Sequence, residues 1–443
     1  MKRPASKLRL LPLAAGAAIF LYSASASALG LLQAYEMALK NDPAYRAAYY
    51  TAESGKENRI LGRAGLLPSL SGNLNTTRNR TTIEFMGKDT PRDYTARSNT
   101  VQARQSIFNL EALSRYKQGV AQSAQAEANF DNQSQEVILR VANAYLDVLF
   151  KQDQLALAKA ELEVLREQMK VNELLFKKGE GTRTDALETQ SRLDLSEAQL
   201  LEAQDAVQSA KDTLAGVIGA DVDSVDPLRP GFRIDAPSQR SFDDWRKTAM
   251  ENNHELRALE QGIEVARWEI NKQRSGHTPR VDVVGTYGKS GSETTTTLGE
   301  QNTIRSIGLQ VSVPLFAGGA VNAATRQAAA NREKARADLE VAQDKLLVEL
   351  RRNYNQVASS GPRIDALMKA VDSAKLLVTA TEQSIKGGVR INLDLLTAQR
   401  QVYTVQRDLA QARYAYMLAA LRLRAVAGTL TADDVRMFAA YFE

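Results

Sequence analysis

Residues 176–190 read FKKGEGTRTDALETQ and residues 385–399 read IKGGVRINLDLLTAQ, so one pattern of glycine, aspartate and glutamine recurs 209 positions later. The same spacing relates LAGVIG at 214–219 to LRAVAG at 423–428, and Tyr145 to Tyr354. Residues 41–46 match 252–257 at the nearly identical spacing of 211. A register held over this length indicates a duplicated fold rather than a shared motif.

Residues 1–28 have the pattern of a secretory signal peptide. A basic start precedes an apolar stretch at 10–22, and Ala26-Ser27-Ala28 offers a cleavage site. A membrane anchor is the disfavoured alternative, because the apolar stretch is short. The leader carries four of the five net positive charges of the chain. The mature chain is therefore nearly neutral, and we expect no nucleic-acid partner.

The residue inventory argues against catalysis. The chain has no cysteine, which excludes disulfides and thiolate sites. It has two histidines, and Ala258 stands where a zinc-binding helix beginning His254-Glu255 needs its second histidine. Gly288-Lys289-Ser290 lacks the earlier glycine of a phosphate-binding loop. We therefore expect no enzyme, metal site or cofactor.

Proline placement delimits long helices. No proline lies between Pro91 and Pro227, and Pro362 alone follows Pro314. Apolar residues at helical spacing predict two antiparallel helical hairpins, 111–176 with 184–217 and 320–386 with 392–427. The first helix would be about 100 Å long, which indicates a coiled coil, a tunnel wall or a spacer. A break or kink is expected at Pro362.

Segments of alternating polarity lie between the helices. The clearest strand is 307–315, where Ile307, Leu309 and Val311 alternate with small or polar residues. The other predicted strands are 70–77, 99–107 and 281–287, with polar loops at 78–96 and 289–303. One apolar and one polar face is typical of a transmembrane barrel wall, and soluble surface hairpins are the alternative. Four strands cannot close a membrane barrel, so the membrane interpretation requires several chains.

Together these motifs resemble the TolC-like outer-membrane export channels over residues 29–443. The resemblance rests on the duplication, Asn41-Asp42-Pro43, LPSL at 67–70, VPLFAGG at 313–319 and the two hairpin turns. It implies a mixed α/β membrane protein and a homotrimer. Three chains would each give four strands to one 12-stranded outer-membrane β-barrel, continued by a long α-helical coiled-coil tunnel in the periplasm.

The expected organisation of the chain follows from the resemblance and the repeat. After the signal peptide at 1–28 comes a first repeat at 29–219, made of a helix, a β-hairpin and the long helical hairpin. A linker at 220–245, a second repeat at 246–428 and a C-terminal tail at 429–443 complete it. We expect the tail to lie against the middle of the tunnel near residues 220–245.

Residues 179–185, GEGTRTD, and the mature start at 29–39 look most like the family branch that serves type I secretion. That resemblance implies a periplasmic adaptor, an inner-membrane ABC transporter and unfolded cargo of the extracellular protease or lipase type. The same fold in a multidrug or metal efflux pump is the alternative. A periplasmic coiled-coil scaffold without a pore is another.

The resemblance also assigns the helical hairpins to the closed periplasmic end of the channel. Matching positions imply a pore gate of Thr184, Asp185, Arg390 and Asp394. The alternative for Thr184 and Asp185 is that they only cap a helix. Two positions depart from the family pattern. Thr397 stands where a second pore acid often occurs, and Ile385 where an aromatic gate partner can occur.

The turns themselves are where the resemblance implies contact with the helical tips of an adaptor. The expected docking residues are Gly179, Gly181, Thr182, Gly387 and Gly388.

Overall fold

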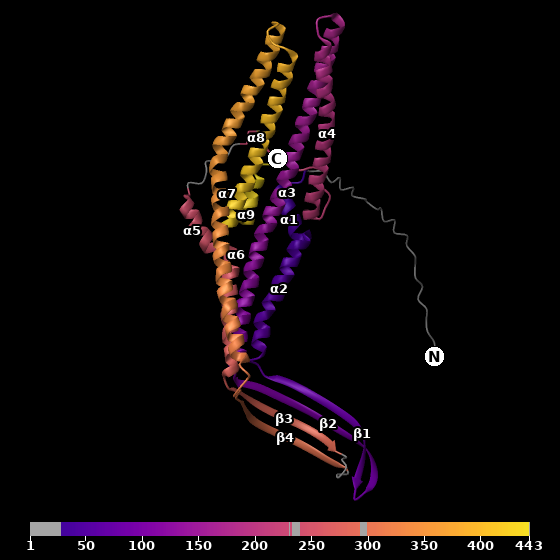
Figure 1. The fold of residues 1–443 in the computed structure, drawn as a ribbon, viewed down its shortest axis with the longest axis vertical. Coiled ribbons are helices and arrows are strands. Elements are labelled where there is room, and N and C mark those ends of the chain that lie inside the picture. The colour runs from indigo at the N-terminus through magenta and orange to yellow at the C-terminus, as the bar shows by residue number, and fades with distance from the viewer. Residues whose placement is uncertain (1–27, 230, 233–239, 293–298, 443) are drawn as a thin grey trace, which may run out of the picture.

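The computed structural model describes residues 28–229, 231–232, 240–292 and 299–442 (Figure 1). The expected signal peptide lies outside these residues, apart from its last position. The described chain is long and narrow, with a β-sheet at one end and the turns of two helical hairpins at the other (Figure 1).

One antiparallel sheet of four strands forms the first end, in the order β1-β2-β3-β4. The strands are β1 (Ser69–Phe85), β2 (Lys88–Phe108), β3 (Arg280–Ser292) and β4 (Glu300–Ser312). Each repeat therefore contributes one hairpin, and the two hairpins meet where β2 pairs with β3.

The loops expected at 78–96 and 289–303 are wrong for most of their length. β1 and β2 pair without interruption up to a two-residue turn at Met86-Gly87, where both residues have positive φ, as a tight hairpin turn requires. β3 and β4 likewise extend to Ser292 and Glu300. Threonine, which is frequent in these segments, is enriched in strands. These segments are polar because they are exposed to water, although they form β-strands.

Four long helices form the second part of the molecule. They are α3 (Leu110–Lys178), α4 (Arg183–Ile218), α7 (Ala320–Lys386) and α8 (Asn392–Val426). α3 packs on α4, and α7 on α8, which confirms the two helical hairpins. With 69 residues, α3 is about 100 Å long.

A break or kink was expected at Pro362; the break is wrong, because α7 continues through this residue, and the kink stays a prediction. Pro362 and Ala358, whose carbonyl loses its helical donor, both lie on the exposed side of the helix. Water can serve that carbonyl there. The hydroxyl of Ser360 donates to the Gln356 carbonyl at 2.5 Å, one turn earlier.

Shorter helices precede each sheet hairpin, and each repeat has two where one was expected. They are α1 (Leu31–Asn41) and α2 (Pro43–Ala64) in the first copy, and α5 (Phe242–Asn252) and α6 (His254–Arg274) in the second. A 3₁₀ turn, η1 (Ser275–His277), follows α6. The side chain of Asp42 caps α2 and that of Asn253 caps α6, so the joints are equivalent.

Each repeat ends at a glycine that packs against the junction between the two short helices of the same repeat. Gly219 and Gly428 both have φ of 69°, in the left-handed region. A Cβ on Gly428 would lie 2.2 Å from the Asn252 carbonyl oxygen, and one on Gly219 would lie 2.6 Å from the Asn41 side chain. Only glycine fits both the backbone conformation and the space. The two copies are therefore closed in the same way.

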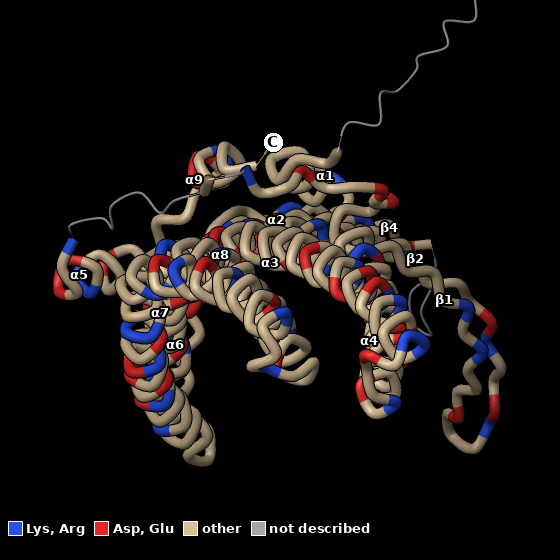
Figure 2. The backbone as a smooth tube through the Cα atoms, turned by 90° about the horizontal axis from the view of Figure 1, so that it is seen from above, with Lys and Arg blue, Asp and Glu red and all other residues tan. Residues whose placement is uncertain are grey.

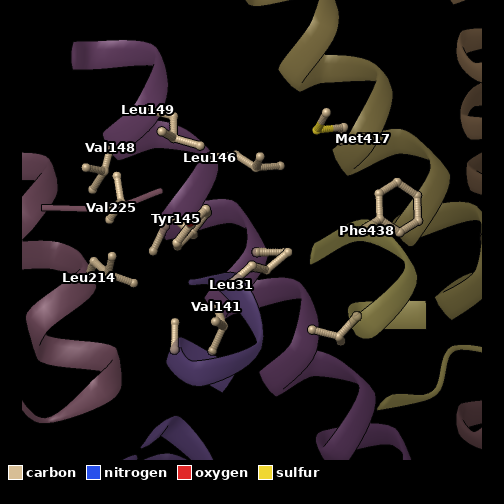
Figure 3. Close-up of a cluster of buried hydrophobic side chains, with 14 of the residues drawn as sticks. Leu31, Val141, Tyr145, Leu146, Val148, Leu149, Leu214, Val225, Met417 and Phe438 are labelled. Atoms are coloured by element: carbon tan, nitrogen blue, oxygen red, sulfur yellow. The ribbon is translucent and has the colours of Figure 1, made fainter. Parts of the chain in front are cut away.

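The main apolar core lies at mid-length, where α1, α3, α4, α8 and the C-terminal segment meet (Figure 3). The Tyr145 hydroxyl lies 3.0 Å from the Leu29 carbonyl oxygen, and its ring packs edge-on against Phe442. Nearby, the Tyr414 hydroxyl donates to Asp153 at 2.8 Å. Burial nevertheless raises the pKa of Asp153.

The C-terminal tail returns to this core, as expected. It contains α9 (Ala432–Ala439), which lies beside α1 (Figure 2). Phe442 forms an antiparallel bridge with Leu228. The Arg229 amide donates to the Tyr441 carbonyl at 3.0 Å. Across the described residues, no helix has the length and apolar character needed to span a membrane.

Candidate functional site at the helical hairpin tips

The first turn joins α3 to α4 and contains a helix stop followed by a helix start. Gly179 takes φ of 77° and donates its amide to the Phe176 carbonyl. Thr182 and Asp185 then form a reciprocal cap. The Asp185 amide donates to the Thr182 hydroxyl oxygen at 3.1 Å, and that hydroxyl donates to the Asp185 carboxylate at 2.6 Å. Such a cap fixes where α4 begins.

Thr184, by contrast, is exposed, and its side chain forms no hydrogen bond within the described residues. Thr182 is therefore the capping threonine. The capping alternative holds for Asp185, whose carboxylate is already engaged within its own turn.

The second turn joins α7 to α8 and is capped differently. Gly388 takes φ of 74°, and its amide donates to the Ile385 carbonyl at 2.9 Å. Ile391 holds the N-cap position, where its side chain cannot accept a hydrogen bond. Arg390 and Asp394 approach to 3.9 Å across one turn of α8. Both side chains are about half exposed, so this ion pair stabilises the turn only weakly.

A groove between the two hairpins contains residues of both turns. Asp185 and Glu180 line it from the first hairpin, and Arg390, Lys386 and Glu382 from the second. Asp185 and Arg390 do not pair with each other within the described residues. Arg390 pairs only weakly with Asp394 and is half exposed, so its charge remains available to groups outside this arrangement.

A closed ring of four side chains bridges the hairpins beneath this groove. The Asn172 amide of α3 and the Asn392 amide of α8 both donate to the Thr189 hydroxyl oxygen of α4, at 2.8 and 3.1 Å. The Gln168 amide of α3 donates to the side-chain oxygens of both asparagines, at 3.1 and 3.0 Å. We call these four residues the tip ring.

The Thr189 hydroxyl is the centre of the tip ring. It also donates to the Asp185 carbonyl at 2.9 Å, so its one donor and two acceptor sites are all used. Thr189 is fully buried and Asn172 is 5 % exposed. A buried polar network that is fully satisfied specifies one arrangement of its helices, because any other arrangement leaves buried groups unpaired.

The tip ring was not predicted from the sequence, although a signal for it is present there. Asn172 follows the buried Leu165 by seven residues, and Thr189 precedes the buried Ser196 by the same interval. Polar residues at such core positions commonly fix the partner and register of packed helices.

The structure places all nine predicted residues at the two turns or in the first turn of the helices that follow. Asp185 and Arg390 share one groove. The glycines at 179, 181, 387 and 388 lie at or next to the outermost bends, and Thr182 serves as a cap. The predicted residues are thus gathered at one end of the molecule, about 100 Å along α3 from the sheet.

Comparison with known proteins gives consistent matches. The family described as "Outer membrane efflux protein" matches twice, at residues 34–220 and 245–429. The chain is 41 % identical to the alkaline protease secretion protein AprF of Pseudomonas aeruginosa, over 98 % of this chain and 92 % of that one. It is 36 % identical to the proteases secretion protein PrtF of Dickeya chrysanthemi, over 95 % and 92 %. In fold it is similar to the outer membrane channel CmeC of Campylobacter jejuni, with a TM-score of 0.80, 15 % identity and coverage of 93 % and 90 %.

Proposed function

The chain belongs to the outer membrane efflux protein family, and we propose that within it this protein is the outer-membrane channel of a type I secretion system that exports extracellular proteases. Membership makes it a non-enzymatic transport protein of the outer membrane, with a helical extension into the periplasm. Channels of this family are trimers that work with adaptor and transporter partners.

The observation that carries the proposal is the likeness to two protease secretion proteins over nearly the whole chain. At 41 and 36 % identity it includes both repeats. The cargo we infer is an unfolded protein, delivered by an inner-membrane ABC transporter through a periplasmic adaptor. Residues 1–28 would direct export, and the repeats 29–219 and 246–428, the linker 220–245 and the tail 429–443 would form the mature wall.

The sheet supports assembly as a trimer. Its order leaves one edge of β1 and one edge of β4 unpaired within the chain. Exposed edges pair with other strands, and closing a barrel removes them. Joining β4 of one chain to β1 of the next in three chains gives a closed barrel of twelve strands.

The hairpin tips support a gate at the periplasmic end. We assign Thr184, Asp185, Arg390 and Asp394 to it because all four lie at or directly after the turns. Arg390 and Asp394 form only a weak, half-exposed ion pair within the chain. In a trimer each residue recurs three times around one axis, so Asp394 would form a ring of like charges that favours cations. The turn residues Gly179, Gly181, Thr182, Gly387 and Gly388 would receive the adaptor.

Gating is tested by single-channel recording in planar bilayers. We expect Arg390→Ser and Asp185→Ala to raise the conductance of the resting channel, because each removes one charge that would hold neighbouring hairpins together. Arg183→Ser is the matched control, since Arg183 is exposed and forms no ion pair within the described residues. Equal conductance in all four proteins would remove these residues from the gate.

Deletion of the gene, followed by comparison of the culture medium, tests the cargo. We expect one or more secreted proteases to disappear and to return on complementation with the wild-type chain. An unchanged medium with increased drug or metal sensitivity would instead identify an efflux channel.

A further inference from the structure

The sheet has two chemically different faces. Residues paired directly across neighbouring strands lie on the same face, so the register assigns every position. One face carries apolar residues in its half nearest the helices: Leu70, Val101, Val283, Tyr287, Ile307 and Leu309. The other carries Ser71, Gln102, Asp282 and Gln310. In a membrane barrel the apolar face contacts lipid.

A basic row crosses the apolar face. Counting along each strand from the helices, the first charged residue on this face is Arg78 on β1, Arg97 on β2, Lys289 on β3 and Arg305 on β4. All four are exposed. On this face, the first charged residue after the apolar residues is therefore basic in all four strands.

The register makes these four residues neighbours. Lys289 pairs with Thr303 on the neighbouring strand, and Arg305 lies two residues from Thr303 toward the helices. The same offset, one strand across and two residues along, leads from Arg97 to Lys289 and from Arg78 to Arg97. A step of about 4.8 Å across and about 6.7 Å along places successive Cα atoms about 8 Å apart. The basic row is thus a continuous diagonal line across all four strands.

The opposite face has no such row. The residues flanking the four cations along their strands, which point to the other face, are Thr77, Asn79, Ala96, Ser98, Gly288, Ser290, Ile304 and Ser306. A solvated region without a specific partner would carry charges on either face. These lie on the lipid side alone.

The row also has few acids near it on its own face. Asp93 is engaged by Arg80 at 3.0 Å, further from the helices, where it also lies near Arg78. Within the described residues, Arg97, Lys289 and Arg305 form no ion pair. Arg305 instead lies 5.7 Å from the ring of Tyr287, an aromatic residue of the kind that lines membrane–water boundaries.

We propose that the basic row binds the phosphate groups of the lipid that surrounds the barrel on its outer side. Lys and Arg are the side chains that pair with phosphate, and the row lies where the apolar band ends on the side away from the periplasmic helices. Three chains place twelve such cations around the barrel. The inference rests on the outer-membrane location and is independent of the cargo.

The test uses the full-length trimer in phosphatidylcholine nanodiscs containing a small fraction of lipid A, a diphosphorylated glycolipid. Its retention is measured by native mass spectrometry and compared with that of dephosphorylated lipid A. We expect the wild type to prefer the phosphorylated form. Arg97→Gln, Lys289→Gln and Arg305→Gln should each weaken that preference roughly fivefold. Arg92→Gln, on the other face of β2, is the control and should leave it unchanged.

Migration as a trimer on gels establishes that each variant is folded. Equal preference in the wild type and all three row variants, or an equal loss in the control, would overturn the proposal. Competition by inorganic phosphate at low concentration would identify a site for free anions instead, and would also overturn it. Failed protease secretion with intact lipid preference would refute the proposed function alone.

Discussion

Thr189→Val should weaken the closed arrangement of the hairpin tips. Valine keeps the shape of threonine and replaces the hydroxyl with a methyl group. The substitution removes the acceptor shared by Asn172 and Asn392 and opens the tip ring at its centre.

The expected magnitude follows from burial. The Asn172 amide is nearly fully buried and would be left without an acceptor, which costs about 1–3 kcal/mol. Water can replace the lost partner of Asn392, which is only half-buried, so its loss costs about 1 kcal/mol or less. The sum of about 1–4 kcal/mol corresponds to a change of roughly 5- to 900-fold in the balance between joined and separated hairpins.

Single-channel conductance of the purified trimer measures this balance, and we expect longer and more frequent openings. Thr397→Val is the matched control. The Thr397 hydroxyl donates to the Leu393 carbonyl one turn earlier, as Thr189 does to Asp185, but it is exposed and bridges no helices. Thr189→Val with Asn172→Leu should recover part of the closure, because apolar groups then face each other. Identical gating in Thr189→Val and the control would refute the role of the tip ring.

Three further changes test the packing of the tunnel through thermal unfolding of the trimer, followed by circular dichroism. Because burial raises the pKa of Asp153, the folded state binds a proton more tightly than the unfolded one. Wild-type stability should therefore rise as the pH falls through that raised pKa toward the ordinary pKa of an aspartate; Asp153→Asn should remove this contribution, and an unchanged pH profile would contradict it. Gly428→Ala should destabilise the folded trimer by more than about 2 kcal/mol, because Gly428 has a positive φ and the Asn252 carbonyl blocks the new Cβ. Gly216→Ala, at an exposed helix position with open space around it, should stabilise it by about 1 kcal/mol. Equal effects of the two variants would show that the contact between residue 428 and Asn252 does not limit stability. Pro362→Ala restores a helical donor at an exposed position and should stabilise by up to about 3 kcal/mol, and a lower melting temperature would mean that the proline is needed where it stands.

The helices could be predicted well because the residues that start and stop a helix lie close together in the sequence. The ends predicted for α3 and α7 agree with the structure within two residues, since a glycine or a capping side chain marks each turn. The strands were predicted too short, and the one expected at 307–315 also ran past Ser312, where β4 ends. Beyond the apolar band both faces of the sheet are polar. Apolar and polar residues then no longer alternate along the sequence, because that alternation requires one face to be apolar, so the strand cannot be recognised.

The site was predicted in part. Gly179 with Gly388, and Asp185 with Asp394, are visible in the sequence because they repeat at a spacing of 209. The tip ring is not, because Gln168 and Asn392 are far apart in the chain and neither recurs in the other copy. Only packing of α3 against α8 brings them within 3.0 Å, and that geometry depends on the fold of the whole chain.

The uninterrupted helix α3 sets a fixed distance between the two ends of the molecule. It runs from the end of β2 to the first tip in 69 residues, so the distance from the sheet to the tip is set by the number of residues in the helix. One inserted residue would advance everything beyond it by about 1.5 Å and rotate it by about 100°. Residues that faced the core would then face water. Changes in the reach of such a channel must therefore come in steps that restore the helical phase, and in both helices of a hairpin together.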